Sequence, residues 1–227
     1  MSPRRADPTI RPVLVDIAAR LLAEEGPQAL STRRLATEAD SSTMAVYTHF
    51  GGMSGLVREM VREGFARLHH HLTRVRRTGD PVADMALLGR AYRYNALANP
   101  HLYAVMFGGS SLAGFSLTEE DRQHGRYTLG NAVECATRCF AAGRFRAGDA
   151  ELVAHLMWSA IHGLVALELG GYLIAPYDAD RCFEAQLAGL MVSSGDTLEA
   201  AAGSVAASRG RMRDEVEAVR TEPAADG

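Results

Sequence analysis

The sequence predicts an all-α protein of about nine helices, with a small N-terminal three-helix domain followed by a larger C-terminal helical bundle. Three observations predict this fold. Apolar residues recur at helical spacing along most of the 227 residues, and β-branched residues never alternate for long enough to indicate a strand. Two short helices separated by a tight polar turn are indicated between residues 30 and 50. The first 77 residues hold 12 Arg against 8 acidic residues, whereas residues 78–227 hold 12 Arg against 19, so a basic segment precedes an acidic one.

The first predicted helix covers residues 13–25 and ends before Gly26. Its inner face is expected to carry Val13, Ile17, Leu21 and Leu22. The second and third helices lie within residues 30–50, LSTRRLATEADSSTMAVYTHF, and residues 39–42 interrupt the apolar pattern between them. Side-chain oxygens are expected to cap both helices, from Ser31 or Thr32 for the second and from Ser41 or Ser42 for the third.

The third helix has an apolar side and a second side with no evident packing role. Val46 and Phe50 are four residues apart and face inward. The opposite side carries Thr43, Met44, Tyr47 and Thr48. Such side chains are expected on the surface of so short a helix where something binds them, and the major groove of DNA admits one α-helix. The pair is interpreted as a helix-turn-helix, although two ordinary bundle helices with a polar face would give a similar pattern. The basic N-terminal segment favours the first interpretation, because phosphate binding needs positive charge.

The segment LSTRRLATEADSSTMAVYTHFGGMSGLVREMV resembles the DNA-binding domain of the TetR family of one-component bacterial regulators. The resemblance covers roughly residues 10–62 and rests on residues 30–36 and 45–50. It implies binding to a palindromic operator in double-stranded DNA. The residues expected to contact DNA are Thr32, Arg33, Arg34, Ser42, Thr43, Met44, Tyr47, Thr48 and His49. The solvent face of the third helix would meet base edges, and phosphates would be gripped by Thr32, Arg33, Arg34 and His49.

The chain departs from the family pattern at two places. The family usually has Gly-Val at the turn where this sequence has Asp40 and Ser41, a mild change because Asp tolerates left-handed backbone geometry. The family also usually has a Lys just after the aromatic close, where this sequence has Gly51, Gly52 and Met53. The second departure removes a phosphate contact. Binding is therefore expected to depend more on Arg33 and Arg34 and on the N-terminal Arg4, Arg5 and Arg11.

The C-terminal part is expected to hold six further helices. They are predicted at residues 54–77, 81–99, 100–106, 119–143, 149–175 and 179–192. The inner side of the first of these is expected to carry Leu56, Met60, Phe65, Leu68 and Leu72. Residues 107–117 are rich in Gly and Ser and are expected to form a loop. From residue 195 onward large apolar residues are few, so a mobile tail is expected, with a weak helix over residues 210–219 as the alternative.

The predicted helix over residues 149–175 is apolar on nearly all sides and must be buried on most of them. We expect a second copy of the chain to cover part of it, together with the helix over residues 179–192. A homodimer would also place two recognition helices about 34–36 Å apart, the spacing of successive major grooves. Trp158, His162 and Gly163 form W-x3-H-G, which resembles the C-terminal domain of a TetR subfamily named for these residues, over roughly residues 85–192.

A cavity for a small hydrophobic effector is expected in the C-terminal part, since such sites are mostly apolar with few polar groups. The residues expected to line it are Phe65, Met85, Tyr92, Tyr103, Met106, Phe107, Tyr127, Met157, Trp158 and His162. Each of these side chains fits an ordinary helical core as well. His162 fits a hydrogen bond to a carbonyl one turn back, and Gly163 fits close helix approach. A strongly anionic effector is disfavoured, because Lys is absent and Arg is sparse on the apolar faces.

Other kinds of site are not indicated. There is no run of 18 apolar residues and no secretion signal, which predicts a cytoplasmic protein that does not enter a membrane. His69, His70 and His71 point in three directions on a helix and cannot converge on a metal ion. Cys135 and Cys139 are one helical turn apart and are either buried thiols or a redox pair. No catalytic constellation and no cofactor motif is present, so an enzyme is not expected.

Taken together, the sequence predicts a ligand-responsive transcriptional regulator, a repressor that leaves its operator when effector binds. DNA binding is assigned to residues 1–53, ligand binding and dimerisation to residues 54–194, and a tail to residues 195–227. Two alternatives remain: a DNA-binding protein without an effector, and a small helical carrier or enzyme that uses the apolar cavity. The effector, the operator and the target genes are not readable from the sequence.

Overall fold

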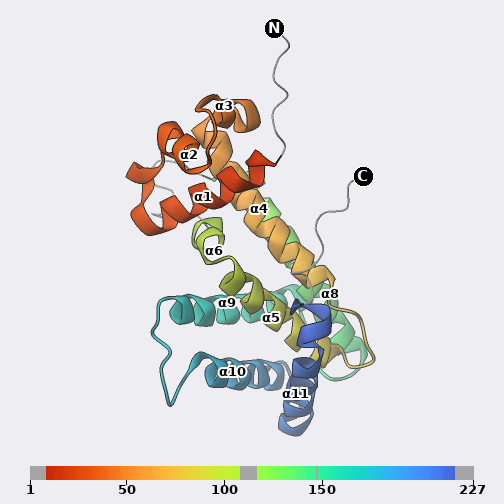
Figure 1. Ribbon diagram of the computed structural model, residues 1–227. Helices are drawn as coiled ribbons and strands as arrows, with labels where there is room; N and C mark the ends of the chain where they lie inside the picture. Colours follow the sequence, from red (N-terminus) through yellow and green to blue (C-terminus); the bar gives the residue numbers. More distant parts are fainter. Residues whose placement is uncertain (1–8, 108–116, 147, 218–227) are drawn as a thin grey trace. The chain divides into compact units, whose positions relative to one another are not determined.

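The computed structural model describes residues 9–107, 117–146 and 148–217, and all regular structure in these ranges is helical (Figure 1). The all-α prediction is therefore confirmed. The helices of the described ranges are α1 (Ile10–Glu25), the 3₁₀ helix η1 (Pro27–Ala29), α2 (Thr32–Glu38), α3 (Met44–Phe50), α4 (Met53–Thr73), α5 (Pro81–Ala98), α6 (Pro100–Met106), α7 (Glu119–Thr128), α8 (Gly130–Ala141), α9 (Ala150–Leu169), α10 (Ala179–Ser193) and α11 (Leu198–Glu215).

Eleven α-helices thus occupy the described residues, where about nine were expected. The predicted helix over residues 119–143 is divided at Leu129 into α7 and α8, and α11 is additional. Helix α4 ends at Thr73 instead of residue 77, and α9 ends at Leu169 because Gly170 and Gly171 follow it. Of the expected loop over residues 107–117, residues 108–116 lie outside the described ranges.

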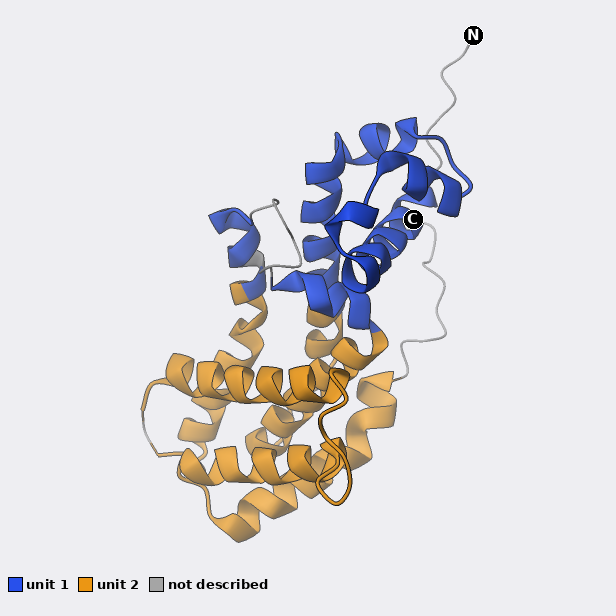
Figure 2. Cartoon of the chain, turned by 90° about the vertical axis from the view of Figure 1, so that its left-hand side faces the viewer, with its two compact units in different colours: residues 1–67, 99–125 blue, residues 68–98, 126–227 orange. Residues whose placement is uncertain are grey.

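The chain forms two compact units (Figure 2). Unit 1 consists of residues 1–67 and 99–125, and unit 2 of residues 68–98 and 126–227. Unit 1 therefore contains α1 to α3, α6 and the first parts of α4 and α7. The expected domain boundary after residue 53 would assign all of α4 to the C-terminal part, whereas the compact units divide this helix after Arg67.

The core of unit 1 explains why the first part of α4 belongs there. Leu56, Val57 and Met60 of α4 are buried together with apolar residues of α1, α2 and α3, and two residues of α6, Leu102 and Val105, join the same cluster. Helix α1 faces both α2 and α6, so it buries two adjacent stripes. Its buried residues are Leu14, Val15, Ala18, Ala19, Leu21 and Leu22. The predicted inner face of α1 was wrong at Val13, which is exposed, because the second stripe rotates the buried side of the helix.

Helix α5 is the centre of unit 2. Every residue from Pro81 to Tyr92 is buried, and α8, α9, α10 and α11 all pack against α5. Gly89 permits this close packing, because a Cβ atom there would lie 2.9 Å from Cδ1 of Ile161 and 3.2 Å from Cδ2 of Leu187. Helices α9 and α10 lie side by side and are antiparallel (Figures 1 and 2).

Helix α11 contradicts the expectation of a mobile tail from residue 195 onward. It begins after Thr197, whose side-chain oxygen accepts a hydrogen bond from the backbone N–H of Ala200. Its buried residues are Ala201, Ser204, Val205, Ser208 and Glu215. The prediction failed because it required large apolar side chains, whereas α11 packs on α5 through small residues and is held by polar contacts. Residues 218–227 of the expected tail lie outside the described ranges.

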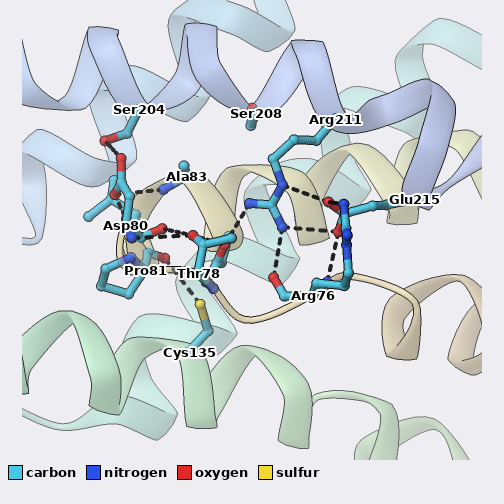
Figure 3. A network of polar contacts seen from close by, with 12 residues as sticks. Arg76, Thr78, Asp80, Pro81, Ala83, Cys135, Ser204, Ser208, Arg211 and Glu215 are labelled. Atoms are coloured by element: carbon cyan, nitrogen blue, oxygen red, sulfur yellow. Dashed lines mark hydrogen bonds and ion pairs between the residues drawn. The ribbon is translucent and has the colours of Figure 1, made fainter.

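The polar contacts join α11 to the segment between α4 and α5 (Figure 3). Arg211 donates to Oδ1 of Asp84 at 2.6 Å and to Oε1 of Glu215 at 2.8 Å. Asp84 also accepts from the hydroxyl of Thr78 at 2.7 Å and from Nη2 of Arg138 at 2.9 Å. Because Asp84 and Glu215 are almost fully buried, these donors compensate for the lost hydration of the two carboxylates.

This network predicts a loss of stability in acid. Burial alone would raise the pKa of Asp84 and of Glu215, but the hydrogen bonds from Thr78, Arg211, Arg138 and Arg76 outweigh it. The pKa of Asp84 is held below its usual range, and that of Glu215 is lowered to about 2. A carboxyl whose pKa is lower in the folded protein stabilises it fully above about pH 5, and this stabilisation is lost as the pH falls through the folded pKa.

We therefore expect the urea midpoint of unfolding to decline between about pH 5 and about pH 2.5. The matched variant is Glu215→Gln, which removes the carboxyl whose pKa is lowered to about 2. Its midpoint should be lower at pH 7 and should decline less steeply with acid. An identical pH dependence in both proteins would show that Glu215 does not contribute to acid sensitivity.

Candidate functional site

The recognition face of α3 is exposed as the sequence predicts. Met44 and Tyr47 are 62% and 56% exposed, and Thr43 and Thr48 are exposed beside them. On the opposite side Val46 is fully buried in the core of unit 1. Two large side chains on the surface of a seven-residue helix leave apolar area in water that a bound partner would cover. The geometry of the predicted helix-turn-helix is therefore present.

The turn between α2 and α3 is built differently from the prediction in one respect. Ser31 caps α2 as expected, because its hydroxyl accepts from the backbone N–H of Arg34 at 3.3 Å. The N-cap of α3 is Thr43, and no side chain caps it, so the expected caps from Ser41 or Ser42 were wrong. Ser42 instead contributes its backbone carbonyl, which accepts from Ala45. The tight turn places Asp40 in the left-handed region with φ of 46°, the geometry expected for Asp at this position.

The two arginines of α2 differ in availability. Arg34 binds Glu25 through Nη1 and Nη2 at 2.7 and 2.6 Å and Glu38 through Nε at 3.0 Å, so it joins α2 to the end of α1. These hydrogen bonds raise the pKa of Arg34 and lower that of Glu25. Arg33 is exposed, and its guanidinium pairs with no carboxylate among the described residues. Arg33 is therefore the freer of the two to bind a phosphate.

The remaining predicted DNA contacts surround α3. Thr32 is half-buried as the first residue of α2, and His49 is half-buried with its ring 6.1 Å from that of Phe50. The hydroxyl of Thr48 donates to the carbonyl of Met44 at 2.9 Å, which leaves the oxygen free to accept. Near the same end of unit 1, Arg11 binds Glu59 at 2.7 Å and lies over the ring of Phe50.

The sequence reasoning missed one residue of unit 1 that joins three elements. Arg67 of α4 donates to Glu63 in the same helix at 2.8 Å, to Oδ1 of Asn99 at 2.8 Å and to Oδ1 of Asp16 in α1 at 2.9 Å. Asn99 directly precedes α6 and lies in unit 1 with Arg67 and Asp16, so this arginine joins α1, α4 and the start of α6 within that unit. Only the spacing of Glu63 and Arg67 is visible in the sequence, because the other partners are 32 and 51 residues away.

Four of the predicted effector residues lie together in unit 1. The rings of Phe65 and Tyr103 each approach that of Phe107 with centroids 5.5 Å apart. Met106 is buried against α4, where a Cβ on Gly64 would lie 2.4 Å from its Cγ. This group is an aromatic cluster at the junction of α4 and α6.

The other six predicted effector residues lie in unit 2. Met85 and Met157 are buried, and the hydroxyl of Tyr92 lies 3.0 Å from Nδ1 of His162. The hydroxyl of Tyr92 is thus one partner of His162, and burial lowers the pKa of the imidazole. The ring of the half-buried Trp158 contacts the ring of His162. Tyr127 is exposed, with its ring against that of His69.

Two hollows of about 240 Å³ each are outlined by residues of unit 2, and none of the ten predicted effector residues lines either of them. One hollow lies between α5, α10 and α11 and is lined by Arg90, Arg93 and Phe183 among others. The second lies between the segment after α4 and α8.

Helix α9 has one side covered and one side exposed. It packs against α5, α8 and α10, yet only 28% of its most apolar window is buried within the chain. It is the one helix among the described residues that is long and apolar enough to cross a membrane. The exposed side carries Leu152, Leu156, Ser159, Gly163 and Leu167 at helical spacing. A Cβ at Gly163 would meet no atom within 4 Å, so this glycine makes no close helix contact within the described part of one chain.

Two family models match the chain. The model for bacterial regulatory proteins of the tetR family matches residues 14–60, which span the helix-turn-helix of unit 1. The model described as tetracyclin repressor-like, C-terminal domain, matches residues 85–190, from α5 to α10. Helix α11 lies outside both matches. No curated protein matches the chain.

Solved structures are similar over most of the chain. A protein of unknown function from Rhodococcus sp. RHA1 is 28% identical with a TM-score of 0.70, and the match covers 86% of this chain and all of that one. The TetR family regulator PfmR from Thermus thermophilus is 20% identical with a TM-score of 0.63, covering 82% and 96% of the two chains. RolR in complex with resorcinol is 16% identical with a TM-score of 0.58, covering 87% and 93%.

The last two likenesses concern the fold, whereas the family models also match the sequence. The matched segments follow each other in chain order, the first on the helix-turn-helix and the second on the helices around α5. The chain therefore belongs to the TetR family of ligand-responsive, DNA-binding bacterial transcriptional regulators.

Proposed function

We propose that the protein is a homodimeric, cytoplasmic repressor that binds a palindromic operator and leaves it when a small hydrophobic effector binds the C-terminal domain. In this proposal residues 1–53 bind DNA, and residues 54–194 bind the effector and form the dimer. The protein acts by binding and not by catalysis. The exposed face of α3 is the observation that carries the proposal, because Met44 and Tyr47 are 62% and 56% exposed although both are large and largely apolar.

The recognition helix would enter the major groove with its exposed side. Thr43, Met44, Tyr47 and Thr48 would reach base edges, where a methionine or a threonine methyl group fits against a thymine methyl and a hydroxyl accepts or donates a hydrogen bond. Thr32, Arg33, Ser42 and His49 surround this face and would bind the phosphate backbone. Arg34 would contribute mainly by holding α2 against α1, since Glu25 and Glu38 occupy its guanidinium.

We expect Arg33→Ala to weaken operator binding and to reduce the slope of log affinity against log salt by about 1, because one phosphate contact is lost. The measurement is a titration of operator DNA at several salt concentrations. The matched control is Arg122→Ala, an exposed arginine of α7 with one ion pair to Glu119. A changed preference for one base, with the salt slope unaltered, would show that Arg33 reads sequence instead.

The dimer is proposed to form through α9 and α10. The exposed side of α9 carries three leucines and Gly163, and the exposed side of α10 carries the small residues Ala185, Gly189 and Ser193, four residues apart. Small residues let a partner helix approach closely, and leucines fill the remaining space. A partner on this side would cover the apolar surface of α9 that the chain itself leaves exposed.

The effector is proposed to bind where the aromatic and methionine side chains gather, with Tyr92, Trp158 and His162 as the polar and aromatic set in unit 2. Trp158, His162 and Gly163 lie on one helix, which supports the subfamily named for these three residues. RolR, which shares the fold, holds resorcinol, and a single aromatic ring is a reasonable size for a ligand here. The hydroxyl–imidazole pair of Tyr92 and His162 would orient a phenolic or similar group.

Release from DNA requires that the effector bind one conformation better than the other. Helix α4 contributes to both units, and Arg67 on it binds both Asp16 of α1 and Asn99 directly after α5. A change in the position of α4 would therefore reach the helix-turn-helix through the covalent continuity of this helix, and Arg67 would pass it to α1 within unit 1.

The test is a titration of the purified protein onto the intergenic DNA beside its own gene, with footprinting at several salt concentrations. The proposal expects a protected near-palindrome, tight binding and a steep dependence on salt. Weak binding that is indifferent to sequence would contradict operator recognition at this locus.

A further inference from the structure

A hollow of about 240 Å³ in unit 2 is lined by residues that the proposed function does not use. It lies where the segment after α4 passes α5 and α8. Its floor is apolar and consists of the buried side chains of Leu72, Leu88 and Cys135. Its walls carry Arg76, Arg77 and Arg138.

The cations around this hollow outnumber the carboxylates. Its lining holds three arginines, Arg76, Arg77 and Arg138, and two carboxylates, Asp84 and Glu134. Arg211 and Glu215 pair with members of this set from outside the lining. Arg74, which is close by, donates to the backbone carbonyl of Glu215 and not to a carboxylate. The lining itself therefore carries one more arginine than carboxylates next to its apolar floor, a composition that favours an anion.

The arginines differ in whether their carboxylate partners are buried or exposed. Glu215 is buried and accepts from Arg76 and Arg211 (Figure 3). Asp84 is buried and accepts from Arg138 and Arg211, so the contacts of both carboxylates hold the fold together. Arg77 pairs only with Glu134, and the two side chains are 69% and 48% exposed. An exposed pair of this kind contributes little to stability and exchanges partners readily. Arg77 is thus the group that an incoming anion can engage without disturbing the buried network.

We propose that this hollow binds a small monocarboxylate, with the carboxylate on Arg77 in place of Glu134 and its apolar part on Leu72, Leu88 and Cys135. A guanidinium binds a carboxylate with two parallel hydrogen bonds, which suits a single acid group better than a neutral ligand. The volume is below the 300–1,000 Å³ of ordinary drug-sized sites, so a single ring or a short chain fits. The arginines concerned lie in the segment between α4 and α5 and on α8, and not on the apolar helix faces.

Cys135 belongs to the apolar floor and is not a reactive group. Its thiol donates to the carbonyl of Pro81 at 3.2 Å, and the hydrogen bond with Cys139 together with burial raises the pKa of the thiol. The thiol stays neutral and packs as a small apolar side chain. The proposed site therefore acts by binding alone.

This inference goes beyond the proposed function, because carboxylate binding needs neither DNA nor a dimer. It also suggests a route to regulation. Helix α4 begins in unit 1 and ends at Thr73, four residues before Arg77. A ligand bound to Arg77 would therefore contact the segment that directly continues this helix.

The experiment measures binding of benzoate and hexanoate to the full-length protein by calorimetry, with benzyl alcohol and hexanol as neutral counterparts. The acids are expected to bind with 1:1 stoichiometry per chain and the alcohols at least about tenfold more weakly, because they lack the charge-assisted hydrogen bonds. Arg77→Gln should weaken benzoate binding about tenfold. Glu134→Gln should strengthen it severalfold, since the competing carboxylate is removed. Arg122→Gln, which breaks an exposed ion pair with Glu119 in unit 1, should leave it unchanged.

The opposite signs at Arg77 and Glu134 separate this site from general attraction of anions to the surface. The proposal is overturned if neither acid binds below about 10 mM, if the alcohols bind equally well, or if Arg77→Gln and Glu134→Gln leave affinity unaltered. Failure of operator binding would not affect these measurements, and failure of carboxylate binding would leave the operator titration intact.

Discussion

Leu156→Glu in α9 is expected to convert the protein into a monomer and to lower its affinity for operator DNA by a factor on the order of 10²–10⁴. The side chain is 53% exposed in the single chain and lies midway along the exposed stripe of α9, between Leu152 and Ser159. In the proposed dimer it would be buried between two copies. A carboxylate there loses its hydration without gaining a partner, and the cost is doubled because each copy contributes one.

The effect on DNA follows from the loss of the dimer. A palindromic operator offers two half-sites, and a dimer engages the second one intramolecularly once the first is bound. A monomer binds each half-site independently and loses this gain, although its α3 is unaltered. The monomer should therefore retain folding and weak DNA binding while it loses tight operator binding.

Analytical ultracentrifugation gives the oligomeric state, and a DNA titration gives the affinity. The matched control is Leu198→Glu, because Leu198 is 70% exposed at the start of α11 and is outside the proposed interface. Leu198→Glu should remain dimeric with unchanged affinity. A Leu156→Glu protein that stays dimeric would exclude the centre of α9 as the dimer contact, whatever its affinity for DNA.

The helix-turn-helix was predictable because its determinants are local. The cap at Ser31, the left-handed Asp40 and the division of α3 into a buried Val46 and an exposed Tyr47 each depend on residues within one or two turns. The predicted caps at Ser41 and Ser42 failed at the same scale, since Thr43 begins α3 without a side-chain cap. Local sequence signals thus predicted the position of α3 correctly but misplaced the residue at which it begins.

Contacts between distant residues were not predictable. Helix α11 reads as a polar tail because its own surface offers few large apolar groups, and the partners that hold it are far away in the sequence. Arg211 reaches Asp84 across 127 residues, and Arg76 donates its backbone N–H to Glu215 across 139. Arg67 is similar, with one partner visible at helical spacing and two that only the fold brings near.

The predicted effector residues show a further limit of sequence patterns. Methionine and aromatic side chains at helical spacing indicate apolar packing, but they do not separate a core from a cavity. Phe65 and Tyr103 pack in unit 1, Tyr92 and His162 bond to each other in unit 2, and Tyr127 is exposed.

The buried network around Asp84 gives the largest expected loss of stability. Asp84→Ala should lower the free energy of unfolding by about 3–5 kcal/mol, because it leaves Arg138 and Arg211 without a shared carboxylate in a buried site. The backbone N–H and the hydroxyl of Thr78 lose their acceptor as well, at 2.8 and 2.7 Å from the carboxylate in the native protein. The matched control is Glu134→Gln, which breaks an exposed pair and should cost at most about 1 kcal/mol.

Urea unfolding measures both variants, and hydrogen exchange locates the change. Because Arg211 and Glu215 of α11 belong to the network around Asp84, the amides at the C-terminal end of α11 should lose protection first in Asp84→Ala, before those of α5. The double variant Asp84→Ala with Arg211→Met should be more stable than the sum of the single effects predicts, since it removes a cation together with its partner. Additive effects, or a loss below about 1 kcal/mol in Asp84→Ala, would mean that water replaces the carboxylate at little cost and that α11 is held by its small apolar contacts instead.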